Sequence, residues 1–117
     1  ILIADANHTR RNLLRATLHD PRYQIIEASG GVQALALREV HQPDLVILDI
    51  MMPGMDGMQC LAALKGDPVT RGIPVVLMTA RAQQSDVQAG MAAGAAAYLI
   101  KPFELDHLIR TVKEAVG

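Results

Sequence analysis

Residues 46–57 read VILDIMMPGMDG, and this stretch decides the fold. A run of aliphatic side chains leads to one carboxylate, Asp49, and a segment with Pro and Gly follows it. The aliphatic run predicts a buried strand, and the Pro and Gly residues predict a turn directly after it. Aspartate is common at turns and helix starts, so Asp49 has an ordinary structural interpretation. The rest of the chain favours a chemical one.

Five short aliphatic runs, this one included, alternate with amphipathic stretches. They are ILIA, YQIIEA, DLVILD, IPVVLMTA and AYLIK, at residues 1–4, 23–28, 44–49, 73–80 and 97–101. Their nearly continuous hydrophobicity is typical of parallel strands covered on both faces. Strict alternation of strands and helices requires right-handed crossovers. We therefore predict an α/β fold, a doubly wound five-stranded parallel sheet with helices on both faces.

Apolar residues at helical spacing predict which faces of the helices are buried. A fourth helix, rich in Ala, is expected over roughly residues 84–93. The expected buried faces are Leu14 and Leu18 in the first helix; Val32, Leu35, Ala36 and Val40 in the second; Met58, Leu61, Ala62 and Leu64 in the third; and Leu105, Leu108, Ile109, Val112 and Val116 in the last.

Length and composition indicate one domain over residues 1–117 with an aliphatic core, because aromatic residues make up only 3% of the chain. A net charge of −1 gives no general attraction to nucleic acid or to an anionic membrane. No apolar run approaches the roughly 18 residues that a membrane span needs. Cys60 is the only cysteine, which excludes an internal disulfide and favours a buried thiol in a reducing cytoplasm. Because the chain starts at Ile1 without Met, we expect it to be part of a longer protein.

Four of the predicted strands end in polar residues: Asp5, Asp49, Thr79 and Lys101. Doubly wound sheets bind ligands beyond these carboxyl ends, where the strand order reverses, so we expect the four side chains in one crevice. Singly, each has an ordinary role as a turn, cap, strand or solvated residue. Together they suit phosphoryl transfer, because Asp49 can attack phosphorus, a divalent cation can offset charge, and Thr79 and Lys101 can hold phosphoryl oxygens.

The same segments resemble the receiver domain of bacterial two-component response regulators, over the whole chain. The segments are ILIADAN for the acidic end of the first strand, VILDIMMPGMDG for the phospho-acceptor, VVLMTA for the Thr-Ala segment and AGAAAYLIKPF for the Tyr and Lys-Pro segment. The resemblance implies a flavodoxin-like sheet with strand order 2-1-3-4-5.

The resemblance also implies functional roles for single residues. Asp49 would accept a phosphoryl group from a histidine kinase or phosphotransfer protein, and Thr79 and Lys101 would bind that group. Tyr98 would be the switch aromatic that turns inward as Thr79 moves. The peptide bond before Pro102 would be cis. A face formed by the fourth helix, fifth strand and fifth helix would carry the signal to an output domain or partner protein.

A magnesium site is implied by the resemblance, with Asp5, Asp49 and the main-chain carbonyl of Met51 as ligands, of which Asp5 would normally act through bound water. The family usually has two adjacent acids at the first strand end, whereas here Ala6 follows Asp5. Water can complete the octahedral shell of Mg²⁺, so we expect a weakened site. Asn7 is either a nearby amide ligand or the cap of the first helix.

Further departures concern the residues around the site. Met51 and Arg81, two positions beyond Asp49 and Thr79, take the places that flank the attacking water in the family, and predict slow loss of a phosphoryl group. Pro53, Gly54 and Gly57 would shape the loop after the acceptor. Ala96 and Ala97 stand where many receivers of transcription factors carry acids that bridge a dimer, which argues against that kind of homodimer. The four histidines show no ligand spacing.

The leading hypothesis is a phosphorylation-dependent signalling switch, with self-phosphorylation and autodephosphorylation as its only chemistry. A pseudo-receiver that binds partners without phosphorylation is the first alternative, and Ala6 favours it. A haloacid-dehalogenase-like phosphatase would need a second Asp where Met51 stands. A flavin-binding protein would need more aromatic rings than the three present, Tyr23, Tyr98 and Phe103.

Overall fold

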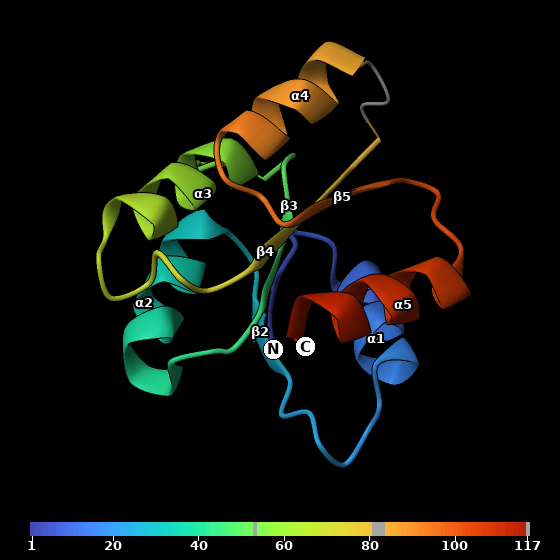
Figure 1. Ribbon diagram of the computed structural model, residues 1–117. Coiled ribbons are helices and arrows are strands. Elements are labelled where there is room, and N and C mark those ends of the chain that lie inside the picture. Colours follow the sequence, from blue (N-terminus) through green and yellow to red (C-terminus); the bar gives the residue numbers. More distant parts are fainter. Residues whose placement is uncertain (53, 81–83, 117) are drawn as a thin grey trace.

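The computed structural model describes residues 1–52, 54–80 and 84–116. Strands and helices alternate along the described chain, as the sequence predicts (Figure 1). The strands are β1 (Leu2–Ala4), β2 (Ile26–Ala28), β3 (Val46–Asp49), β4 (Val75–Thr79) and β5 (Ala97–Ile100). The helices are α1 (His8–Thr17), α2 (Gly31–His41), α3 (Gly57–Gly66), α4 (Gln84–Ala92) and α5 (Leu105–Val116).

All five strands pair in parallel in the order β2-β1-β3-β4-β5, which confirms the predicted sheet. Ala4 pairs with Leu48, and Asp49 pairs with Met78 in the next strand. The strand order reverses between β1 and β3, which are neighbours in the sheet. Their carboxyl ends therefore flank the switch point at which ligands of such sheets bind.

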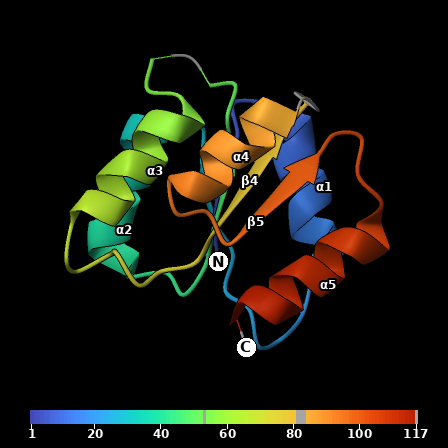
Figure 2. The same ribbon diagram turned by 45° about the horizontal axis from the view of Figure 1, so that its top comes forward.

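Two aliphatic clusters cover the two faces of the sheet. Alternate strand residues face opposite sides, so Leu48 and Leu77 lie in one cluster and Ile47 and Val76 in the other. Helices α2, α3 and α4 lie on the first side, and α1 and α5 on the second (Figure 2). With both faces covered, the central strands β1, β3 and β4 are fully buried. These strands hold the residues at their carboxyl ends in fixed positions.

Strand β2 is shorter than the run YQIIEA predicts. It begins at Ile26, whereas the expected strand begins at Tyr23. Its neighbour β1 starts at Leu2, which pairs with Ile26, and the contacts before this pair are the hydrogen bonds of Ile1 with Gln24 and Ile26. Tyr23 instead donates its N–H to the carbonyl of Asp20 in a turn.

The buried face of α2 differs from the predicted one. Val32 and Val40 are 68% and 75% exposed, so both were wrongly placed in the core. The face that packs is the stripe of Gly31, Ala34 and Leu35, at spacings of three and four. Gly31 lies so close to Met55 that an added Cβ would be 2.7 Å from the Met55 carbonyl oxygen. Small residues bring α2 close to the loop before α3, and this leaves the valines outside.

Helix α5 is also rotated from the prediction. Leu108 and Val112 are fully buried as expected, but Leu105 and Val116 are 44% and 38% exposed. Thr111 takes part in the buried face, because its hydroxyl donates to the carbonyl of His107 one turn earlier at 2.8 Å. A hydroxyl that is satisfied within the helix can be buried at little cost.

Helices α1 and α3 follow their predictions more closely. Leu14 and Leu18 are buried, and so are Leu61 and Leu64, whereas Ala62 is not. Cys60 is fully buried, and burial raises the pKa of its thiol to about 11, which fits an inert core cysteine. None of the helices in the described part of the chain combines the length and the hydrophobicity that a membrane span requires.

Candidate functional site

Two buried carboxylates lie at the switch point of the sheet. Asp49 is the last residue of β3 and is 3% exposed, and Asp5, directly after β1, is completely buried. The main-chain N–H of Asp5 still donates to Ala28 in β2 at 3.0 Å, so the chain leaves the sheet only beyond Asp5. Buried carboxylates need partners, and both have them.

Lys101 directly follows the edge strand β5, and its side chain reaches these carboxylates. Its Nζ lies 3.1 Å from Asp49 Oδ2 and 3.8 Å from Asp5 Oδ2. The main-chain N–H of Lys101 donates to the carbonyl of Thr79 at 2.7 Å, which holds the end of β5 against the end of β4. Thr79 is fully buried at this edge, and the peptide bond from Lys101 to Pro102 is cis.

Arg10 is a member of the pocket that the sequence analysis missed. Its Nη1 lies 3.0 Å from both carboxylate oxygens of Asp5 and 3.4 Å from Asp49 Oδ2. The side chain of Asn7 caps α1 by accepting from the N–H of Arg10 at 2.9 Å, which places Arg10 in the first turn beside the pocket. The capping interpretation of Asn7 is therefore confirmed. Two cations face two carboxylates in this pocket.

Each oxygen of the Asp49 carboxylate has a donor. Oδ1 accepts from the main-chain N–H of Met51 at 3.1 Å, and Oδ2 receives Lys101 and Arg10. Burial raises the pKa of Asp49, and the nearby Asp5 raises it further, while the hydrogen bond from Lys101 acts in the opposite direction. The Met51 side chain itself points to solvent and is 57% exposed.

The pocket offers oxygen ligands of the type that Mg²⁺ prefers. They are the carboxylates of Asp5 and Asp49 and, next in the chain, the carbonyl of Met51. Ala6 is exposed and adds none. Among the described residues no group of three or more His, Cys, Asp or Glu side chains could hold a metal ion. The donors suit Mg²⁺ in chemistry, but the described residues bring only two acids to the pocket, Asp5 and Asp49, and Arg10 pairs with both.

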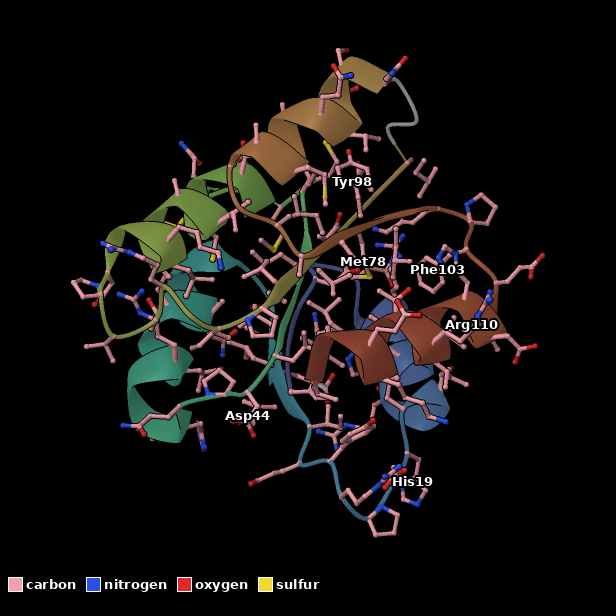
Figure 3. The ribbon with its side chains drawn as sticks, in the orientation of Figure 1. His19, Asp44, Met78, Tyr98, Phe103 and Arg110 are labelled. Atoms are coloured by element: carbon pink, nitrogen blue, oxygen red, sulfur yellow. The ribbon has the colours of Figure 1, made fainter. Side chains whose placement is uncertain are left out.

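A groove of about 400 Å³ opens beside the two cations and is lined by Arg10, Leu13, Ala80, Lys101, Pro102 and Phe103. Phe103 lies on the segment between β5 and α5 (Figure 3). The groove gives solvent a path to the side of the pocket that the cations occupy.

Tyr98 lies on β5 beneath α4 (Figure 3). It is partly buried against the cluster that contains Leu77. Gly90 of α4 makes room for the ring, because an added Cβ would lie 3.1 Å from two Tyr98 ring carbons and 2.9 Å from a Leu77 methyl. Glycine at this helix position therefore lets the Tyr98 ring and the Leu77 side chain pack close to α4, and an added side chain would require them to shift.

The remaining predicted residues are distributed as follows. Gly54 has φ 75°, a left-handed conformation that favours glycine, and Gly57 begins α3. Pro53 and Arg81 lie outside the described residues. Ala96 is exposed and Ala97 partly buried. All histidines are exposed, as expected of surface residues: His8, His19, His41 and His107.

A doubly wound sheet with an acidic pocket and a lysine at its switch point defines a class of small α/β signalling domains. The family model described as "Response regulator receiver domain" matches residues 1–113. The chain therefore belongs to the response regulator receiver domains of two-component signalling, as the resemblance predicted.

Curated relatives and solved structures agree with this assignment. Protein PilH of Pseudomonas aeruginosa is 37% identical, and the match covers 100% of this chain and 97% of PilH. Response regulator PleD of Caulobacter vibrioides is 42% identical over 89% of this chain, which spans only 23% of PleD. A putative response regulator structure from Chloroflexus aurantiacus has a TM-score of 0.92 at 34% identity and covers 98% of this chain and 94% of its own. The chemotaxis protein CheY4 structure of Vibrio cholerae has a TM-score of 0.90 at 29% identity and covers 97% and 95%.

Proposed function

We propose that this domain is a phosphorylation-dependent signalling switch whose acceptor is Asp49. One observation carries the proposal: the Asp49 carboxylate is held at the carboxyl end of β3 with the Lys101 Nζ at 3.1 Å. The Met51 N–H orients the other oxygen of Asp49, so the nucleophile is fixed before a donor arrives. Membership of the receiver family supports this role for the pocket.

The reaction transfers a phosphoryl group from a phosphohistidine of a kinase or phosphotransfer protein. A carboxylate oxygen of Asp49 attacks phosphorus, the P–N bond breaks with its electron pair going to the imidazole, and an acyl phosphate forms on Asp49. Lys101 and the hydroxyl of Thr79 would bind the phosphoryl oxygens. Mg²⁺ at Asp5, Asp49 and the Met51 carbonyl would, when bound, offset the charge of those oxygens.

The signal would leave the pocket through Thr79 and Tyr98. Thr79 ends β4, and Tyr98 lies on the neighbouring strand beneath α4. A shift of Thr79 toward a phosphoryl group would alter how Tyr98 packs and so change the face formed by α4, β5 and α5. We propose this face as the binding surface for an output domain or partner protein.

The domain would act as a cytoplasmic switch with no substrate turnover beyond its own phosphorylation and dephosphorylation. The exposed side chain of Met51 is apolar and cannot orient a water molecule, so we expect slow hydrolysis of the acyl phosphate. Arg81 would be the second residue that affects the rate of this hydrolysis. We propose residues 1–117 as one domain of a longer protein. A homodimer through the same α4-β5-α5 face would lack acidic bridges at Ala96 and Ala97.

The proposal is tested by intact mass after incubation with acetyl phosphate, with and without Mg²⁺. The expected result is one phosphate adduct on the wild-type chain and none on Asp49→Ala. A Thr70→Ala variant, changed at a buried residue in the α3–β4 connection, should keep the adduct and so controls for the effect of a buried substitution on the fold. Absence of an adduct on folded wild-type protein in every condition would contradict the proposal.

A pseudo-receiver that binds its partner without phosphorylation is the second candidate. The observation that favours it is the contact of Arg10 with Asp5 and Asp49 in a pocket that lacks an acid at Ala6. Such a domain would show no adduct and would bind its partner equally well as wild type or as Asp49→Ala. The mass experiment therefore separates the two functions.

A further inference from the structure

Arg10 occupies the space between the two carboxylates of the pocket. Its Nη1 is 3.0 Å from Asp5 Oδ1, 3.0 Å from Asp5 Oδ2 and 3.4 Å from Asp49 Oδ2. Asp5 is completely buried, whereas the Arg10 side chain is 32% exposed. The guanidinium thus closes the solvent side of an otherwise buried carboxylate, with hydrogen bonds to a charged acceptor.

The backbone around Arg10 fixes it in this place. Asp5 Oδ1 accepts from the N–H of Asn7 at 2.8 Å, and the side chain of Asn7 accepts from the N–H of Arg10 at 2.9 Å. Asp5, the cap of α1 and the first turn of α1 are therefore linked by consecutive hydrogen bonds. A long side chain that starts from a fixed first turn loses less entropy on pairing than one from a mobile loop.

A divalent cation needs the oxygens that Arg10 now binds. Mg²⁺ is bound by oxygen ligands at about 2.0–2.1 Å, closer than any hydrogen-bond donor approaches. The Nη1 atom already contacts both Asp5 oxygens and one Asp49 oxygen. A metal ion bound directly to both carboxylates would share that volume with the guanidinium, and the positive charges would repel each other.

We infer that Arg10 is an internal cation of the pocket that competes with Mg²⁺, so that metal binding requires the guanidinium to leave Asp5 and Asp49. The competition acts in addition to the loss of an acid at Ala6. The inference concerns metal binding by the unphosphorylated domain, and so it stands or fails separately from the proposed acceptor role of Asp49.

The test is a calorimetric titration of the unphosphorylated domain with MgCl₂. We expect Arg10→Met to bind Mg²⁺ at least tenfold more tightly than wild type. Arg15→Met is the matched control, because it removes one charge from the same helix, and Arg15 contacts Glu27 and the carbonyl of Ile25 outside the pocket. Its Mg²⁺ affinity should stay within twofold of wild type. Equal or weaker Mg²⁺ binding by Arg10→Met, or no binding by either protein, would overturn the inference.

A second measurement needs no variant. In wild-type protein, the side-chain Nε–Hε NMR signal of Arg10 should shift during the MgCl₂ titration with the same midpoint as the heat, while that of Arg15 stays in place. An Arg10 signal that is unchanged at saturating Mg²⁺ would show that metal and guanidinium do not compete. This result would overturn the inference even if Arg10→Met failed to fold.

Discussion

Gly57 is the position at which a single methyl group should disturb the Asp49 pocket through the backbone. Helix α3 begins at Gly57, whose N–H donates to the carbonyl of Ile50 at 3.0 Å. An added Cβ would lie 2.5 Å from the Asp49 carbonyl oxygen and 2.7 Å from the Cα of Ile50. These are main-chain atoms, so rotation of a side chain cannot relieve the contact. Gly57→Ala therefore requires β3 or α3 to shift.

The size of the effect follows from the size of that shift. Ordinary contacts of Cβ atoms begin at 3.4 Å, so backbone must move by nearly 1 Å. Overpacking of a filled interior costs about 1–3 kcal/mol. The higher helix propensity of alanine offsets up to about 1 kcal/mol of this loss in stability. We expect a net loss of about 1–2 kcal/mol, which for a chain of 117 residues is a fall in Tm of about 4–8 °C.

Urea unfolding of Gly57→Ala and Gly66→Ala measures this difference within one helix. Gly66 is the last residue of α3, and nothing lies within 4 Å of a Cβ placed there. Gly66→Ala should leave the free energy of unfolding unchanged or raise it by up to about 1 kcal/mol. If Gly57→Ala unfolded at the same urea concentration as Gly66→Ala, the argument that Gly57 provides space for the Asp49 peptide would be refuted.

Three further predictions test the pocket, the cap and the core. Asp49→Asn should stabilise the fold at pH 7, because burial and Asp5 raise the pKa of Asp49 and its ionised form therefore costs stability above that pKa. This gain in stability should vanish as the pH falls below about 3.9, the ordinary pKa of aspartate. Urea midpoints measured from pH 3 to 8 test this, and no gain at neutral pH would contradict the prediction. Asn7→Ala should lower the free energy of unfolding by about 1 kcal/mol, measured by urea titration, because α1 loses its cap; an unchanged midpoint would argue against the cap. Leu108→Ala should cost about 2–5 kcal/mol and the exposed Leu105→Ala under about 1 kcal/mol in the same assay, and equal losses would mean that α5 buries a different face.

The fold and the edge at which the pocket lies could both be predicted from the sequence. The central strands of a doubly wound sheet are buried on both faces, so aliphatic runs indicate where they lie, whereas the start of the edge strand β2 was not predicted correctly. Once the strands alternate with helices, topology brings their carboxyl ends to one edge, whatever the side-chain details. This is why the sequence predicts that Asp5, Asp49 and Lys101 lie in one crevice.

Arg10 and the helix faces required the structure. An arginine has several rotatable bonds, and its spacing from Asp5 in the sequence does not determine whether its guanidinium turns inward or to solvent. The buried face of α2 was missed because hydrophobicity selected Val32 and Val40. Packing selected the small residues Gly31 and Ala34, which allow a close approach. Steric fit between elements is a tertiary property, and hydrophobicity alone does not rank small residues such as Gly31 and Ala34 above valine.

Ala6 and Arg10 are best understood as parts of one charge balance. With alanine at position 6 the pocket has two carboxylates, and Lys101 alone would leave one of them uncompensated; Arg10 supplies the missing positive charge. Phosphorylation would replace the Asp49 carboxylate by a phosphoryl group that carries a charge of about −2, so the pocket would gain about one negative charge. If Arg10 stays, that charge is met by a guanidinium already in place, whereas a metal ion can meet it only after Arg10 has left. The dependence of phosphorylation on Mg²⁺ therefore shows whether Arg10 or the metal ion occupies the pocket when the phosphoryl group arrives.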